Sequence, residues 1–435
     1  FGWQVLEVDG HNEIEIKNSI DSSKEETNKP SLIIAKSTIG KFAPNKQNTS
    51  SIHGAPLGNE EMKLFLNEIG WEGDPFDHSD DVYDYFAEKR LEDNKSFEKW
   101  KSNLDNKLNN DDSFKKLWEQ FEKNELSFPE SFEIQEAATR VTGGNYLKLI
   151  GLENKFVLGG SADLAASTKQ IISEESYTSE NRHGQNIEFG IREHSMAAVV
   201  NGISLHSNLF SFGSTFLVFS DYMRPSIRLA SLMNLNSAYI FTHDSIYLGE
   251  DGPTHQPVEH LMSLRLIPGL DVIRPSNSVE TIYAYKYLFS NTKNPKVLSL
   301  TRQNLKFLEY DVDYSDFLNG GFIISKGEDL TIFASGSEVN LALEIKETLK
   351  EYSVQVVSVP ILNKLTPKIS ESLNNNKLTF TIELGKAAGW SDYIGNITES
   401  FSVQTFGKSA PENDLAEFFN VNAESIGKKI RNYLG

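Results

Sequence analysis

Apolar and polar positions form two kinds of pattern along this chain. Short apolar runs of strand length occur from residue 3 onward, and many of the segments between them carry apolar residues three or four positions apart. The apolar runs are typical of buried strands, and the spacing of three or four is typical of helices that cover a sheet. Strands that alternate with helices predict parallel sheets with crossover helices, so the pattern predicts an α/β fold.

The expected strands fall into three groups. The first group has residues 3–8 and 31–36, with a polar helical segment between them. The middle group comprises residues 155–158, 186–189, 238–243, 272–274 and 297–301. The last group comprises residues 330–334, 354–359, 378–382 and 402–406, with a clear helix at 338–349. The middle group predicts a parallel sheet, and the last predicts a smaller doubly wound domain.

Between residues 71 and 129 the composition changes to dense mixed charge. Apolar side chains recur there at helical spacing: Trp100, Leu104 and Leu108, then Phe114, Leu117, Trp118 and Phe121. This spacing predicts amphipathic helices that lie on a domain surface as a linker. The charge runs are expected to form a solvated helix face.

Composition narrows the classes of protein that this chain can be. Its 435 residues suggest about three domains at roughly 150 residues each. The net charge of −19 argues against broad binding to nucleic acid or anionic membranes, and the absence of cysteine excludes disulfides and thiolate chemistry. The longest uncharged apolar stretch, residues 196–205, is too short to cross a bilayer, and no signal peptide opens the chain. A cytoplasmic protein is therefore expected, with chemistry carried by His, carboxylates, Arg, Lys or a cofactor.

Ionisable residues gather after the expected strands of the middle group. The segments in question are residues 159–167, 190–196, 242–260 and 301–304. In open parallel sheets, ligands bind beyond the carboxyl ends of the strands. A charged edge on an otherwise apolar sheet therefore predicts a functional site there.

Individual residues at this edge also have ordinary structural interpretations. Glu193 precedes an expected helix, where a carboxylate commonly complements the helix dipole. His255 and His260 could be packed in loops, and Arg140 and Arg302 could be ion-pair partners. Taken one at a time, these residues do not decide between structure and function.

His243, Asp251 and His255 could together compose a metal site, because they offer suitable donor atoms. Their spacing lacks the helical i, i+4 pairing of the common hydrolase motif. We therefore expect no metal ligand in this chain.

Taken together, these strings resemble the transketolase family, which uses thiamine diphosphate in sugar-phosphate metabolism. The strings at residues 8–11, 41–46 and 53–58 are similar to the end of its diphosphate-binding domain. The strings at 159–167, 190–193 and 242–259 are similar to its pyrimidine-binding domain, and Gly-Glu-Asp-Gly-Pro-Thr-His-Gln-Pro at 249–257 is the most specific. Residues 406–411 are similar to its third domain.

The resemblance implies an organisation for the whole chain. The expected parts are the tail of a diphosphate-binding domain at 1–58, a helical linker at 59–130, a pyrimidine-binding domain at 131–312 and a C-terminal domain at 313–435. Most of the diphosphate-binding domain is expected to be missing, together with the ligands of the Mg²⁺ or Ca²⁺ ion that holds the diphosphate. The origin of that truncation stays open.

The resemblance also implies roles for individual residues. Catalytic roles fall to Glu193, His53 and His255. Cofactor-binding roles fall to Asp163, Glu193, Phe216, Phe219 and Tyr222. Substrate-binding roles fall to Arg140, Ser167, His243, Asp251, His255 and Arg302.

Each implied role has a chemical reason. Glu193 is expected to share a proton with the aminopyrimidine ring, because a poorly solvated carboxyl group holds its proton more tightly. Phe216, Phe219 and Tyr222, three residues apart on one expected helix face, would surround that ring, although spacing alone fits a core stripe equally well. The histidines would move protons of sugar hydroxyls, and the arginines would clamp a terminal phosphate.

The resemblance finally implies partners and an activity. The family forms homodimers with the active site between subunits, and it transfers a two-carbon unit from xylulose 5-phosphate to ribose 5-phosphate or erythrose 4-phosphate. This chain alone is expected to be inactive and to bind thiamine diphosphate weakly or not at all. Two alternatives stay open: a non-catalytic subunit of the same family, or a related synthase for dihydroxyacetone or deoxyxylulose phosphate.

Overall fold

The computed structural model describes residues 1–74, 76–308, 310, 312–374 and 376–435. These residues form two compact units, Phe1–Lys107 and Leu108–Gly435. The larger unit contains two separate sheets, and the smaller unit contains one. No helix among the described residues is both long enough and apolar enough to cross a bilayer.

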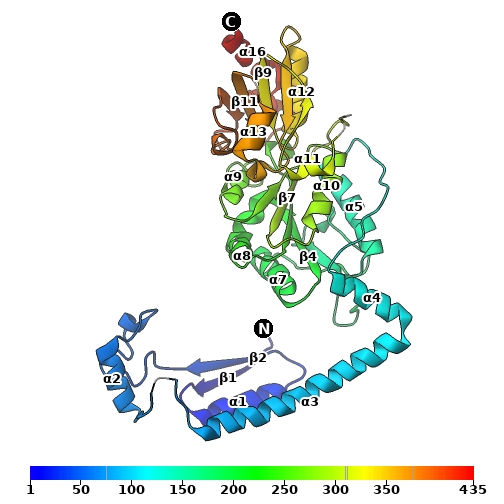
Figure 1. The fold of residues 1–435 in the computed structure, drawn as a ribbon. Helices are drawn as coiled ribbons and strands as arrows, with labels where there is room; N and C mark the ends of the chain where they lie inside the picture. The colour runs from blue at the N-terminus through cyan, green and yellow to red at the C-terminus, as the bar shows by residue number, and fades with distance from the viewer. Residues whose placement is uncertain (75, 309, 311, 375) are drawn as a thin grey trace. The chain divides into compact units, whose positions relative to one another are not determined.

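The first unit contains a short parallel pair of strands. Strands β1 (Gln4–Asp9) and β2 (Ser31–Lys36) are joined by helix α1 (Glu13–Glu25), as the pattern predicted (Figure 1). Asn12 caps this helix, because its side chain accepts hydrogen bonds from the first-turn amides. The 3₁₀ turn η1 (Ser50–Ile52) and helix α2 (Asn59–Glu68) follow.

The predicted amphipathic helices in the charged segment are confirmed. They are α3 (Asp80–Asn110) and α4 (Asp112–Lys123). In α4 the helical spacing aligns aromatic rings, with centroids 6.0 Å apart for Phe114 and Trp118 and 5.6 Å apart for Trp118 and Phe121. Phe121 then packs at 5.5 Å against Phe156, which leads into the middle sheet.

The middle sheet, drawn in green in Figure 1, is entirely parallel, with strand order β3-β4-β5-β7-β6. Its strands are β3 (Val157–Ser161), β4 (Phe210–Phe216), β5 (Ala238–Thr242), β6 (Asp271–Ile273) and β7 (Lys296–Leu300). Its main helices are α5 (Thr139–Glu153), α7 (Glu193–His206), α8 (Ser220–Leu232) and α10 (Ser278–Leu288).

Two hydrophobic cores hold this sheet between helices. One core joins Tyr146 of α5 and Tyr285 of α10 to the strands. The other joins Val200 of α7 and Ile227 of α8 to strand residues that include Tyr239. Because the sheet is covered on both faces, most of its strands read as apolar runs, with β4 as the exception.

The expected strand at residues 186–189 is wrong. This segment lies alongside β3 through hydrogen bonds from the Gly159 amide to the Gln185 carbonyl (3.1 Å) and from the Ile187 amide to the Gly159 carbonyl (2.8 Å). It makes only isolated bridges and continues into a loop. A Cβ on Gly160 would lie 1.9 Å from the Ile187 carbonyl oxygen, so glycine permits this close approach.

The C-terminal sheet has the order β12-β11-β9-β10-β8, and only β8 is antiparallel to its neighbour. Its strands are β8 (Phe322–Ser325), β9 (Leu330–Ala334), β10 (Val354–Ser358), β11 (Leu378–Glu383) and β12 (Glu399–Ser402). Helix α12 (Glu338–Thr348) confirms the helix predicted there. The strand expected at 402–406 is wrong, because β12 ends where it was expected to begin.

The short helices of the larger unit complete the fold. They are α6 (Ala165–Thr168), α9 (His260–Arg265), α11 (Tyr314–Leu318), α13 (Pro367–Leu373), α14 (Ser391–Ile394), α15 (Glu412–Phe418) and α16 (Ala423–Leu434). The 3₁₀ turns are η2 (Leu217–Phe219), η3 (Ile246–Leu248) and η4 (Leu362–Lys364).

Candidate functional site

The loops that follow the middle strands lie at one edge of the sheet. Asp163 follows β3, Phe216 ends β4, His243 follows β5 and Arg302 follows β7. Because these strands are parallel, their carboxyl ends meet at the same edge. The predicted charged edge is therefore where the fold gathers its candidate residues.

An aromatic cavity of about 480 Å³ opens at this edge. Its lining residues are Ala162, Asp163, Leu164, Ile191, Glu193, Phe216, Phe219, Tyr222 and His255. The rings of Phe216 and Phe219 are stacked at 5.8 Å, and those of Phe219 and Tyr222 at 6.1 Å. The cavity thus presents an aromatic wall and the carboxylate of Glu193.

The three aromatic residues come together by a different route from the one expected. The sequence predicted one helix face, but Phe216 ends β4, Phe219 lies in η2 and Tyr222 lies in α8. A strand end, a 3₁₀ turn and a first helical turn place their rings in succession. The cavity therefore confirms their proximity but not the single helix.

Glu193 is the first residue of α7, whereas it was expected to precede the helix. Its carboxylate lies at the positive end of the helix dipole and also lines the aromatic cavity. The helix-dipole interpretation therefore fits this position, and the expected catalytic role of Glu193 stays a prediction.

Arg140, His243 and Ser167 form a second cluster next to this cavity. The Nη1 of Arg140 donates a hydrogen bond to the Ser167 carbonyl at 2.6 Å, and it lies 3.3 Å from Nε2 of His243. The Nε of Arg140 is buried without a hydrogen-bond partner. Arg302 also acts on this cluster, because its charge lowers the pKa of Arg140 after the larger effect of burial. Two neighbouring cations and an unpaired donor favour an anionic ligand.

His243 is a neutral member of this cluster. Burial, followed by the charges of Arg140 and Arg302, lowers the pKa of His243 to about 3. Its Nδ1 lies 2.8 Å from Oγ1 of Thr242. At neutral pH the ring therefore contributes hydrogen-bonding capacity to the cluster without a third positive charge.

The two clusters meet at His243 and Phe216, whose ring centroids lie 3.7 Å apart. His243 has a left-handed backbone with φ of 60°, a conformation that costs a non-glycine residue about 1 kcal/mol or more. Such a conformation persists only where its surroundings fix it. The aromatic cavity and the arginine cluster thus form one continuous site.

His255 and Asp251 belong to the loop with the most specific sequence string. The ring of His255 lies 5.5 Å from that of Phe219, and Asp251 is exposed. Gln256, which the sequence analysis did not single out, holds this loop: its buried Nε2 donates to the carbonyls of Ile246, Gly249 and Lys408 at 3.2, 3.0 and 2.8 Å. Its place directly after His255 in the string was the available signal.

His53 is exposed and directly follows η1 in the smaller unit. Its backbone amide donates to the Ser50 carbonyl at 3.1 Å. The structure describes the two units separately, so the expected role of His53 stays a prediction.

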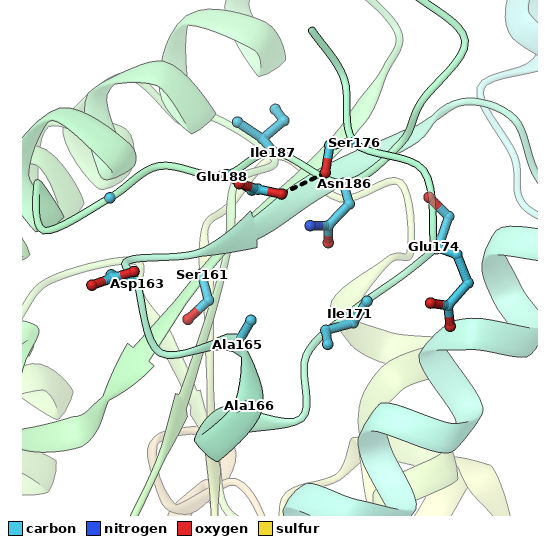
Figure 2. A pocket seen from close by; sticks show the side chains of 12 residues that line it. Ser161, Asp163, Ala165, Ala166, Ile171, Glu174, Ser176, Asn186, Ile187 and Glu188 are labelled. Atoms are coloured by element: carbon cyan, nitrogen blue, oxygen red, sulfur yellow. Dashed lines mark hydrogen bonds between the residues drawn. The ribbon is translucent and has the colours of Figure 1, made fainter. Parts of the chain in front are cut away.

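A second cavity, of about 580 Å³, adjoins the first at Asp163. Figure 2 shows Asp163 at the turn after β3, with Glu188 on the segment above it and Glu174 on the opposite side of the pocket. Glu188 accepts a hydrogen bond from the Ser176 hydroxyl at 2.6 Å. This cavity could not be predicted from the sequence, because much of its lining comes from the irregular segment between α6 and α7.

Among the residues that the structure describes, one group of three acidic or histidine side chains has ligating atoms within 4.8 Å of one another. It consists of Asp221, Glu259 and His260. The alternative metal site of His243, Asp251 and His255 is not such a group. Nε2 of His260 already pairs with Asp221 at 3.1 Å.

Three domain families match this chain. They are transketolase, thiamine diphosphate binding domain, over residues 1–126; transketolase, pyrimidine binding domain, over 135–307; and transketolase-like TK C-terminal domain, over 320–422. The first match corrects the expected linker, because residues 59–126 fall within the thiamine diphosphate binding domain. The expectation that this domain contributes only residues 1–58 is therefore wrong.

Individual relatives match over almost the whole chain. A transketolase from Halalkalibacterium halodurans is 38% identical over 98% of this chain and 67% of its own length. One from Bacillus subtilis is 37% identical over 99% of this chain and 68% of its own length. The chain therefore spans about two thirds of these relatives.

Solved structures show the same fold. A transketolase from Leishmania mexicana superposes with a TM-score of 0.91 at 30% identity, over 99% of this chain and 66% of that one. A Pichia stipitis transketolase in complex with sedoheptulose-7-phosphate gives a TM-score of 0.90 at 30% identity, over 98% of this chain and 66% of that one.

Proposed function

Because the chain belongs to the transketolase family, we propose that its site serves ketol transfer between sugar phosphates. The donor would be a ketose phosphate such as xylulose 5-phosphate, and the acceptor ribose 5-phosphate or erythrose 4-phosphate. The observation that carries the proposal is the continuity of the aromatic cavity with the arginine cluster through Phe216 and His243. One part suits an aromatic cofactor ring and the other a phosphate.

The aromatic cavity fits the pyrimidine end of thiamine diphosphate. Phe216, Phe219 and Tyr222 offer ring faces for stacking, and Glu193 and Asp163 offer oxygens at the cavity wall. When bound, this cofactor supplies the nucleophilic carbon that protein side chains lack. Glu193 would hold a proton at the ring nitrogen that it faces.

The arginine cluster would bind the terminal phosphate of the sugar. Guanidinium groups match phosphate oxygens in a forked geometry, and neutral His243 and the Ser167 segment would complete the contacts. This local positive charge lets an acidic chain with a net charge of −19 select an anionic substrate. The sugar phosphate in the Pichia stipitis complex is of the same chemical class.

The remaining residues are given the roles that membership of the family suggests. His255 and His53 would move protons of sugar hydroxyls, and Asp251 would read a hydroxyl configuration.

We further propose a homodimer with the active site between subunits, Mg²⁺ or Ca²⁺ at the cofactor diphosphate, and a cytoplasmic location. Exposed apolar residues on α7 and α8, among them Leu205, Leu229 and Leu232, support the dimer.

The proposed function is tested by ketol transfer from xylulose 5-phosphate to ribose 5-phosphate, with thiamine diphosphate and Mg²⁺ present. The assay is run on the 435-residue chain and on the encoded protein that contains it. Formation of sedoheptulose 7-phosphate by the encoded protein supports the proposal. No transfer by that protein, with Glu193 intact, would favour the non-catalytic subunit, and transfer to a different acceptor would favour the related synthase.

Replacing Arg302 by alanine should separate phosphorylated from unphosphorylated substrates. We expect KM for xylulose 5-phosphate to rise by about 10- to 100-fold, because a charge-assisted contact is worth about 1.5–3 kcal/mol. KM for a donor without phosphate, such as hydroxypyruvate, should not change. Arg182→Ala, at an exposed arginine of the same sheet domain, is the matched control. Equal effects on both donors would remove Arg302 from the phosphate site.

A further inference from the structure

A buried ion-pair network joins the middle sheet domain to the C-terminal one. Arg274 directly follows β6, and its Nε donates to Oδ2 of Asp244 at 2.8 Å. Its Nη1 and Nη2 both donate to the carboxylate of Glu338, the first residue of α12, with Nη2 at 3.0 Å. The side chains of Arg274, Asp244 and Glu338 are fully buried. The network thus links a loop of one domain to a helix start of the other.

The C-terminal domain also holds the backbone of Arg274. The Arg274 amide donates to the Pro360 carbonyl at 2.8 Å, and the Arg274 carbonyl accepts from the Gly336 amide at 3.1 Å. Gly336 has φ of +59°, and a Cβ at this position would lie 2.7 Å from Nε of Arg274. Arg274 belongs to the middle domain in sequence, but its position is set by the C-terminal domain.

Asp244 depends on this arginine for its orientation. Its Oδ2 is bound by Arg274, and its Oδ1 is buried without a hydrogen-bond partner. The preceding residue is His243, whose left-handed backbone is unfavourable unless its surroundings fix it. A displacement of Asp244 would therefore move the imidazole that lies 3.3 Å from Arg140.

We propose that Glu338 and Arg274 are positioning residues for the phosphate site, acting on His243 through Asp244. The C-terminal domain then belongs to the substrate site, although none of its residues is assigned a contact with substrate. This inference rests on the proposed function, because it takes His243 as a phosphate contact.

The same domain boundary contains a second buried ion pair that serves as a control. Nη1 of Arg265 donates to both oxygens of Glu383 at 2.8 and 2.9 Å, and Trp390 Nε1 donates to the same carboxylate at 2.8 Å. Both side chains of this pair are almost completely buried. It shares Ser335 with the Arg274 network but has no hydrogen bond to Asp244. Glu383 therefore matches Glu338 in burial and charge, but it has no link to His243.

Glu338→Gln and Glu383→Gln are matched perturbations. Both oxygens of Glu338 accept hydrogen bonds, from Arg274 and from the Leu384 amide. Both oxygens of Glu383 also accept. A glutamine therefore places one amide NH₂ against a donor at either position, and the melting temperature should fall in both variants.

The experiment uses the encoded protein that contains this chain. It compares kcat/KM for xylulose 5-phosphate and for hydroxypyruvate, and it records the ¹⁵N resonances of the histidine rings, with His243 assigned by His243→Asn. We expect Glu338→Gln to lower the ratio of the two kcat/KM values by about 5-fold or more and to shift the His243 resonances. Glu383→Gln should change neither.

The inference is overturned if both variants melt earlier but leave the ratio and the His243 resonances unchanged. If Glu338→Gln does not fold, Asp244→Asn provides the same test, because it keeps an acceptor for Arg274 and alters the link to His243. A wild type without ketol transfer would count against the proposed function alone, since the resonances still report on the link.

Discussion

Replacing Glu193 by glutamine should lower kcat for ketol transfer by about 10²- to 10⁴-fold, the usual contribution of a proton-transfer group. Glutamine keeps the shape and one hydrogen-bond acceptor, but it cannot share a proton with a ring nitrogen. The fold should survive, because the lost charge at the start of α7 is worth only about 0.3–1 kcal/mol. The measurement is steady-state kcat together with the melting temperature.

Glu188→Gln is the control for this prediction. Glu188 lies five residues earlier and lines the adjoining cavity, where it accepts from Ser176 instead of facing the aromatic rings (Figure 2). Its replacement should leave kcat within about 3-fold. A Glu193→Gln protein that retains wild-type kcat would restrict Glu193 to helix-dipole stabilisation.

Lys296→Met should remove a large pH dependence of the free energy of unfolding. Lys296 opens β7 with its side chain fully buried, and its Nζ donates to Oδ1 of Asn236 at 2.8 Å and to the Ser290 carbonyl at 3.3 Å. No carboxylate contacts it within hydrogen-bond distance among the described residues. Burial lowers the pKa of Lys296 to about 7.

The direction of this pH dependence follows from the number of protons that the folded and unfolded states bind. Between pH 7 and 10.5 the unfolded lysine is protonated while the folded one is neutral, so the unfolded state binds more protons and stability rises with pH. A shift of this size corresponds to on the order of 5 kcal/mol across that window. Lys296→Met removes this contribution and also loses the hydrogen bonds to Asn236 and Ser290.

Denaturant unfolding of wild type and variant at several pH values measures the effect. The difference between the two free energies of unfolding should change steadily from pH 7 to about 10. Lys293→Met, at an exposed lysine on the preceding turn, should give a difference that does not vary with pH. A pH-independent difference for Lys296→Met would mean that the lysine is charged in the folded protein.

Most of the parallel strands could be predicted from the sequence, because strands covered on both faces read as apolar runs. Strand β4 was missed, since its sequence Phe-Ser-Phe-Gly-Ser-Thr-Phe resembles a polar loop although all seven residues are buried. One of its hydroxyl side chains bonds to a covering helix, because Ser211 donates to the Val200 carbonyl of α7 at 3.0 Å.

Several residues that line the aromatic cavity could be singled out from short sequence motifs, because they lie close together in the chain. Their geometry could not be identified in the same way. Arg274 lies 30 positions from Asp244 and 64 positions from Glu338, so no local pattern reveals the network. The left-handed backbone of His243 is likewise not signalled by the sequence, because a non-glycine residue seldom adopts it.

Gln256 has a practical consequence for altering substrate range. One side-chain amide holds both ends of the segment that carries Asp251, so residues between its anchor points can be exchanged without releasing the loop. Gly407 lacks this freedom, because a Cβ there would lie 1.6 Å from Oε1 of Gln256. Libraries for new sugar acceptors should therefore vary residues 250, 251 and 254 and leave Gln256 and Gly407 fixed.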